Sequence, residues 1–304
     1  MMPTVLSVAA TLAVVAGVVL CALWTSAARA AEPVACGRDA AGHLQSVAFF
    51  YGESVPVEEL AKFGTVVVEP DSGFDPRAQR APCPAWYAYV SVGEVTRERD
   101  YARAMPKQWL VGRNATWAST VVDQTAPGWP AFFVEKVIAP LWAHGYRGFF
   151  FDTLDSYQLV AKTDAARAKQ EAGLVAVIRA VKARYPQAQL ILNRGFEILP
   201  QVHDAVAAVA FESLFGNWDQ RNQRYDTVPT ADRDWLLAQA KTIRERYGLP
   251  VISIDYCAPD DAVCRRTIVA KIRAEGLIPY VTDGALRTVG AGPDATDRND
   301  QQTP

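Results

Sequence analysis

Eight short apolar runs recur along the chain, and most of them are separated by a stretch with the spacing and end signals of a helix. Such alternation indicates a parallel sheet covered by helices, and eight pairs in roughly 260 residues fit a (β/α)8 barrel. We therefore predict one α/β domain, a TIM barrel over residues 45–290. The alternative is an open doubly wound sheet, but no Gly-x-Gly-x-x-Gly motif follows the first run. The predicted strands are Val47–Tyr51, Thr65–Glu69, Trp86–Val92, Gly148–Asp152, Leu190–Asn193, Val206–Glu212, Val251–Tyr256 and Ile278–Thr282.

Helix signals lie between these runs. Pro130 stands at a first helical turn and predicts a helix over residues 131–143. The longest amphipathic segments, residues 164–185 and 232–247, predict two further helices.

The first thirty residues have the pattern of an export signal rather than of a folded domain. An apolar stretch over residues 5–24 is followed by small residues around Arg29, as a signal peptidase requires. We expect cleavage near Ala30 or Ala31 and a secreted or periplasmic protein. The alternative is an uncleaved membrane anchor, because about 20 apolar residues can span a bilayer. Residues 31–44 are then a lead-in to the barrel, and residues 291–304, which lack an apolar period, are predicted to be a disordered tail.

Four cysteines remain once the predicted signal segment is removed. An even number in an exported chain favours two disulfides. We favour Cys257–Cys264, which closes a short loop, and this leaves Cys36–Cys83. The alternative is four buried thiols.

Composition argues against several classes of function. The three histidines lie in different segments and no Cys-x-x-Cys is present, so we expect neither a metal nor a cofactor. The chain has 31 basic and 33 acidic side chains, a net charge of −2 that becomes −3 without Arg29. Nothing in this balance favours nucleic acid as a partner.

Two carboxylates stand at the ends of apolar strands. Residues 149–151 are all Phe and lead into Asp152, and residues 205–211 lead into Glu212. Ligands of parallel barrels bind at the carboxyl ends of the strands, and a pair of acids there predicts glycosidic bond cleavage. The fourth and sixth strands lie two strand spacings apart, about 9.6 Å. If each side chain reaches inward by roughly 2 Å, the two carboxyl groups lie about 5 to 6 Å apart. We therefore predict retention of configuration, with Asp152 as nucleophile and Glu212 as general acid/base. The alternative is that each acid pairs with an arginine or caps a helix.

Further polar groups follow other strands and are candidates for substrate binding. Acids outnumber bases among them, so we expect the site to attract a cationic ligand such as an amino sugar polymer. Asp155 has an alternative role, because with Ser156 it could cap a helix. The candidates are Tyr51, Asp71, Glu94, Asp155, Asn193, Tyr256 and Asp283.

The connection over residues 93–129 is long for a loop that follows a barrel strand, and it contains Trp109, Trp117 and Trp129. Indole rings pack well on the flat faces of sugars, so the three are candidate platforms at the rim of the site. They could equally cover a small core of the loop itself.

The order of these motifs resembles glycoside hydrolase family 114, the endo-α-1,4-polygalactosaminidases. The resemblance covers Gln45 to Arg287 and rests on the runs SVAFFYG, YAYVSVGE, GFFFDTLDS, LILNRGFE, VAFES and IPYVTD. It implies a TIM barrel without a metal that cuts α-1,4-linked galactosamine internally, as in a biofilm matrix polysaccharide. The family's catalytic pair falls on Asp152 and Glu212.

We expect a monomer that binds this polysaccharide and touches a membrane only through an uncleaved N-terminal segment. Two other functions stay open. One is a non-catalytic component that binds or exports a glycan, and the other is an exo-α-galactosidase-like enzyme.

Overall fold

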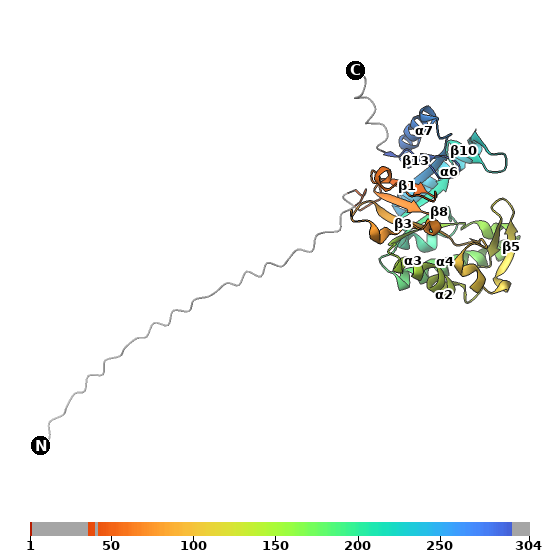
Figure 1. The fold of residues 1–304 in the computed structure, drawn as a ribbon. Coiled ribbons are helices and arrows are strands. Elements are labelled where there is room, and N and C mark those ends of the chain that lie inside the picture. Colours follow the sequence, from red (N-terminus) through yellow and green to blue (C-terminus); the bar gives the residue numbers. More distant parts are fainter. Residues whose placement is uncertain (2–35, 40–41, 294–304) are drawn as a thin grey trace. The chain divides into compact units, whose positions relative to one another are not determined.

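The computed structural model describes Met1, residues 36–39 and residues 42–293 (Figure 1). Eight parallel strands pair in one sheet in the order β1-β2-β3-β7-β8-β9-β12-β13. Each end lies within two residues of its predicted position, so the predicted strands are confirmed. The strands are β1 Val47–Phe50, β2 Thr65–Val68, β3 Ala85–Ser91, β7 Gly148–Asp152, β8 Gln189–Asn193, β9 Ala208–Glu212, β12 Val251–Tyr256 and β13 Ile278–Thr282.

The sheet curls until its first and last strands lie side by side (Figure 1). The Tyr280 hydroxyl on β13 donates a hydrogen bond of 2.8 Å to the Phe49 carbonyl on β1. The Tyr51 backbone amide also donates a hydrogen bond of 2.7 Å to the carbonyl of Leu286, just past β13. These bonds bridge the seam, and the sheet is a nearly closed (β/α)8 barrel, as the sequence predicts.

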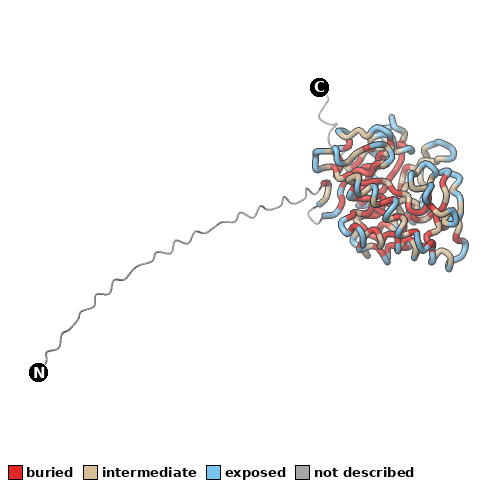
Figure 2. The backbone as a smooth tube through the Cα atoms, turned by 60° about the horizontal axis from the view of Figure 1, so that its bottom comes forward, coloured by how far each residue is buried: buried red, intermediate tan, exposed pale blue. Residues whose placement is uncertain are grey.

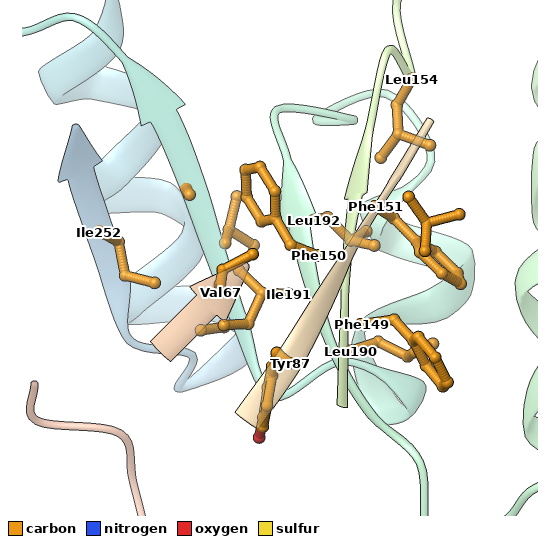
Figure 3. Close-up of a cluster of buried hydrophobic side chains, with 14 of the residues drawn as sticks. Val67, Tyr87, Phe149, Phe150, Phe151, Leu154, Leu190, Ile191, Leu192 and Ile252 are labelled. Atoms are coloured by element: carbon orange, nitrogen blue, oxygen red, sulfur yellow. The ribbon is translucent and has the colours of Figure 1, made fainter. Parts of the chain in front are cut away.

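The Phe run of β7 is buried on both faces, which explains why it lacks the alternation of a half-exposed strand. Figure 3 shows Phe149 and Phe151 on one side of the strand and Phe150 on the other. Phe150 packs inside the barrel against Phe49, with ring centroids 4.8 Å apart. Phe151 packs outward against Phe133, at 5.7 Å. Burial of each ring contributes up to about 3 kcal/mol, so the run anchors β7 on both sides.

Helices surround the strands, with α2, α3 and α4 together on one side in Figure 1. The predicted helices over residues 164–185 and 232–247 are confirmed as α4 and α6. The helix predicted over residues 131–143 is instead α2, a π-helical stretch over Phe133–Ile138 and α3. The α-helices are α1 Val57–Leu60, α2 Trp129–Phe132, α3 Ala139–Ala143, α4 Asp164–Arg184, α5 Leu199–Val202, α6 Thr230–Tyr247 and α7 Ala262–Ala274. Short 3-10 turns lie at Pro70–Ser72, Pro76–Ala78, Asp100–Ala104, Lys107–Trp109, Ser156–Leu159 and His203–Ala205.

Local chemistry sets where the long helices begin and end. The Thr163 hydroxyl accepts a hydrogen bond of 3.2 Å from the Ala166 amide and caps α4. Gly248 ends α6 with φ of 65°, a left-handed conformation that favours glycine. In Figure 2 the buried backbone fills the interior and the exposed loops surround it.

Two small antiparallel units follow β3 and β9 and extend the carboxyl-end face of the barrel. After β3 come β4 Glu94–Val95, β5 Leu110–Asn114 and β6 Ser119–Val122, paired in the order β4-β6-β5. After β9 come β10 Gly216–Asp219 and β11 Arg224–Thr227, which pair as a hairpin.

The three tryptophans of the long connection after β3 have different environments. Trp129 is buried and packs against Trp109, with ring centroids 6.2 Å apart, so these two belong to the core of the insertion. Trp117 lies in the turn between β5 and β6 and is 57% exposed. Only this one of the three remains a candidate platform.

Both predicted disulfides are present. Cys36–Cys83 joins Cα atoms 5.3 Å apart, and Cys257–Cys264 joins Cα atoms 6.1 Å apart. The first ties the lead-in to the segment before β3, and the second ties the end of β12 to α7.

The chain remains attached to the barrel slightly beyond residue 290. The Ala291 amide and carbonyl both form hydrogen bonds with Val281 of β13, at 2.8 and 2.9 Å, so Ala291, which was predicted to begin the tail, is ordered against the barrel. The predicted signal segment, residues 1–30, lies outside the described residues except for Met1, and so do residues 294–304. Among the helices of the described residues, none is both long and apolar enough to cross a membrane.

Candidate active site

A cavity of about 490 Å³ opens at the carboxyl ends of the barrel strands. Asp152 and Glu212 both line it, from the last positions of β7 and β9. Because strand side chains alternate, Asp152 points to the same side as Phe150, into the barrel. The structure thus brings the two acids together at the face where the sequence places them.

Asn193, at the end of β8 between the two acidic strands, links the acids directly. Its side-chain amide donates 2.8 Å to Asp152 Oδ1 and 3.2 Å to Glu212 Oε1. Two oxygens that share this nitrogen can be no farther apart than the sum of these distances, 6.0 Å. This limit lies near the spacing of retaining glycosidases, about 5 to 5.5 Å, and below the 6.5 Å or more at which inverting enzymes admit a water.

The backbone turns sharply after two of these strands. Thr153 follows Asp152 with φ of 61°, and Arg194 follows Asn193 with φ of 58°, both in the left-handed region that costs a side-chain-bearing residue about 1 kcal/mol or more. Hydrogen bonds hold these turns. The Gly93 amide donates 2.8 Å to the Thr153 hydroxyl, and the Arg194 guanidinium donates 2.8 Å to the Glu212 carbonyl.

The two acids differ in their surroundings. Burial, followed by the nearby charge of Asp152, raises the pKa of Glu212 to about 7, against an opposing hydrogen bond from Tyr256. Burial also raises the pKa of Asp152, but Asn193, the Thr153 amide and the Tyr89 hydroxyl all donate to that carboxylate and oppose the shift. The arrangement therefore favours a proton on Glu212 and a charge on Asp152 near neutral pH.

Three phenols surround the pair. The Tyr89 hydroxyl donates 2.9 Å to Asp152 Oδ2, and the Tyr256 hydroxyl donates to Glu212 Oε2. Tyr51 packs on Tyr89, with ring centroids 5.0 Å apart. Burial raises the pKa of all three phenols well above the usual value, so each keeps its proton.

The lining is acidic. Four carboxylates of the described residues contribute to it, with Arg99 as the one guanidinium: Glu69, Glu94, Asp152 and Glu212. Arg99 is itself engaged, donating 2.5 and 2.9 Å to the two oxygens of Glu69 and 2.7 Å to Asp71. A surplus of negative charge in a cleft attracts a cationic ligand.

Comparison with known proteins assigns the family. The profile of glycoside-hydrolase family GH114 matches residues 26–298. The chain belongs to this family. The GH114 chain is thus a glycoside hydrolase, the enzyme class that the sequence predicts.

Solved structures agree with this assignment. The glycoside hydrolase domain of PelA from Pseudomonas aeruginosa is 35% identical, with a TM-score of 0.74 over 81% of this chain and 97% of that one. Ega3 from Aspergillus fumigatus, solved in complex with galactosamine, shares the fold at 14% identity, with a TM-score of 0.59 over 82% of this chain and 95% of that one.

A sequence relative is an uncharacterized protein of Deinococcus radiodurans, 27% identical over 211 residues, which are 66% of this chain. The match spans 64% of the relative's own length.

The predicted substrate-binding residues of the GH114 chain fall into two groups. Tyr51, Glu94 and Tyr256 line the cavity, and Asn193 contacts both acids. Glu94 is buried, and its carboxylate accepts hydrogen bonds from Ser119, from Ser156 at 2.5 Å and from Asn114 at 3.0 Å. Its carboxylate therefore links the three strands of the inserted sheet to one another and to Ser156, which follows β7.

The other three predicted residues, Asp71, Asp155 and Asp283, lie outside the lining of the cavity. Asp71 pairs with Arg99, and Asp283 accepts bonds of 2.9 and 2.8 Å from the amides of residues 287 and 288. Asp155 is half-buried and begins the 3-10 turn Ser156–Leu159 without a side-chain capping bond. Acids that follow a strand also suit tight turns, which accounts for Asp283.

Sequence reasoning missed Tyr89, Arg99 and Trp218, which also line the cavity. Tyr89 lies two residues before Ser91, the end of β3, so strand alternation could have placed it on the inward face. Trp218 lies on β10 and Arg99 lies beyond β4, and neither small unit was predicted.

Asp255 supports the site from behind. It is fully buried on β12, where burial raises the pKa of its carboxyl. Its oxygens accept hydrogen bonds from the amides of residues 214–216 and from Ser253. The segment that follows Glu212 is thereby fixed in position.

Proposed function

We propose that this GH114 chain is an endo-acting hydrolase that cleaves α-1,4-linked galactosamine-rich polysaccharide with retention of configuration. The observation that carries the proposal is the amide of Asn193, which bonds to both acids and limits the separation of those oxygens to 6.0 Å. An acidic cavity suits the ammonium groups of such a polymer. The likeness to the PelA hydrolase domain and the galactosamine bound to Ega3 support the choice of sugar.

In the first step, Asp152 attacks the anomeric carbon and forms a glycosyl–enzyme bond as the bond to the bridging oxygen breaks. Glu212 gives its proton to that oxygen, and the released chain carries a new hydroxyl. Asn193 and Tyr89 hold the attacking carboxylate in position.

In the second step, Glu212 takes a proton from a water whose oxygen attacks the same carbon. The bond to Asp152 breaks, and both carboxyls return to their starting states. Two inversions give net retention. The pKa of Glu212, about 7, suits a group that must both donate and accept a proton.

The test mixes the protein with a partially deacetylated α-1,4-linked galactosamine polymer and follows new reducing ends. We expect oligosaccharides from the wild type, with the α-anomer formed first by NMR, and no product from Glu212→Ala. Glu197→Gln is a matched control, because this exposed acid follows β8 but lies outside the cavity lining. Release of monomer alone would favour an exo-enzyme, and binding without product would favour a non-catalytic glycan-binding component.

We further propose that the chain acts outside the cytoplasm. Two disulfides support an oxidising compartment. Residues 1–30 are then a signal peptide, and the mass of the exported protein tests whether the chain begins near Ala31. A mature protein that retains residues 1–30 would instead support an anchor.

A further inference from the structure

A second hollow adjoins the main cavity at Glu212. It has a volume of about 210 Å³ and shares Glu212, Ser213 and Asn217 with the main cavity. Its other side is formed by Asp232 and Trp235 of α6. The two hollows are therefore contiguous, and Glu212 lies where they meet.

The α6 side of this hollow presents an apolar ring beside a carboxylate. Trp235 is 47% exposed, and its ring is supported edge-to-face by Phe196 at 5.6 Å between centroids. Asp232 lies three residues earlier on α6, so the two side chains share one face of the helix. Asp232 is exposed, and its carboxylate has no hydrogen bond or ion pair with any of the described residues. An indole and a free carboxylate at this spacing can bind the C–H face and a polar group of one sugar ring.

The position of the two acids gives the hollows different roles in the proposed reaction. The nucleophile must touch the sugar that stays on the enzyme, whereas the general acid touches the oxygen that joins this sugar to the departing chain. Both acids line the main cavity, but only Glu212 lines the second hollow. The departing chain therefore leaves past Glu212 toward α6.

We propose that the hollow beside α6 binds the first hexosamine of the departing chain, with its ring against Trp235 and its amino or hydroxyl group on Asp232. This inference rests on the proposed function and assigns a direction to the polysaccharide across the barrel. The chain segment that keeps the new reducing end lies on the Trp117 and Trp218 side, and the released segment lies on the Trp235 side.

Charge supports a separate role for this hollow. Besides Glu212, it contains one guanidinium, Arg194, and one carboxylate, Asp232. The main cavity instead has a surplus of carboxylates over Arg99. A balanced site accepts a galactosamine whether or not its amine is acetylated, while the acidic cavity favours the free amine.

The test compares two substrates with different departing groups. One is the galactosamine polymer, and the other is an α-linked galactosamine trisaccharide with fluoride as the leaving group, which is too small to contact α6. We expect Trp235→Ala to lower kcat/KM on the polymer roughly tenfold, because it removes the apolar contact, and to change kcat/KM on the fluoride substrate less than about twofold. Asp232→Asn should give the same pattern with a smaller loss.

Two control variants sharpen the comparison. Asp234→Asn alters an acid of α6 that pairs with Arg233 and lies outside the hollow, and it should leave both rates unchanged. Trp117→Ala alters a residue that lines the main cavity but not the hollow, and it should lower both rates together.

The outcomes separate this inference from the proposed function. A wild type that cleaves neither substrate overturns both. A wild type that cleaves both substrates, with Trp235→Ala unchanged on the polymer, overturns only the assignment of the hollow. Equal losses on both substrates would also overturn it, since they would show that Trp235 supports the fold or Glu212. If Trp235→Ala fails to fold, the exposed Asp232→Asn variant decides the question.

Discussion

Removal of one hydroxyl should shift the pH dependence of the enzyme in a known direction. The Tyr256 hydroxyl donates to Glu212 and favours its charged form, so Tyr256→Phe raises the pKa of Glu212 above about 7. A hydrogen bond to a charged group contributes about 1.5 to 3 kcal/mol, and one pKa unit corresponds to about 1.36 kcal/mol. Some compensation by water is expected in an open cavity, so we predict a shift of about one unit.

The sign of the pH shift follows from the proposed role of Glu212. As a general acid it must be protonated, so kcat/KM falls as the pH rises through its pKa. In Tyr256→Phe this fall should occur about one pH unit higher than in the wild type. The assay is kcat/KM on the galactosamine polymer between about pH 5 and 10, since this ratio reports the pKa values of the free enzyme.

Tyr89→Phe is the matched control. The Tyr89 hydroxyl donates to Asp152, which must be ionised to attack in the proposed mechanism. Loss of this bond raises the pKa of Asp152, so the acidic limb of the kcat/KM profile should move to higher pH while the basic limb stays in place. If the basic limb of Tyr256→Phe stays where it is or moves to lower pH, Glu212 is not the group that protonates the leaving oxygen.

Two further predictions concern stability. The folded-state pKa of Glu212 is raised from 4.5 to about 7, so its contribution to stability is complete below pH 4.5 and is lost as the pH rises through about 7. Glu212→Gln should therefore exceed the wild type in unfolding free energy at pH 8, by at most about 3 kcal/mol, and differ little at pH 4. Urea unfolding at the two pH values checks this, and an equal difference at both would contradict it. Chain entropy predicts a loss of roughly 4 kcal/mol when the disulfide of sequence separation 47 is replaced by serines, against roughly 2.5 kcal/mol for the one of separation 7. Thermal melts of the variants Cys36→Ser/Cys83→Ser and Cys257→Ser/Cys264→Ser measure this order, and a larger loss in the second would refute it.

The barrel and its acid pair could be predicted because they depend on local patterns. Strands that are buried on both faces require continuous apolar runs, and these runs mark their own ends. An acid directly after such a run is thereby placed at the carboxyl end of the sheet, as Asp152 and Glu212 are. The bridging position of Asn193 follows from strand order, but its double contact depends on side-chain conformation that no periodicity reveals.

The rest of the site depends on contacts between distant segments. Arg99 pairs with Glu69 only because the insertion after β3 folds back over β2, and the sequence gives no signal for that contact. Trp117 and Trp129 lie in the same connection, yet Trp117 is exposed and Trp129 is buried. Trp117 lies in the turn that the pairing of β5 with β6 creates, whereas Trp129 begins α2. Residues in irregular rims are fixed by tertiary packing and not by propensity.

The amide of Asn193 has a consequence for how the stereochemistry of such an enzyme can change. An inverting enzyme needs space for a water between its acids, and here the side-chain amide of Asn193, from the strand between them, contacts both acids. A change from retention to inversion would have to disturb these two contacts of β8. In the proposed mechanism, β8 takes part in no bond that forms or breaks, yet its Asn193 helps to decide which face of the sugar the incoming hydroxyl occupies.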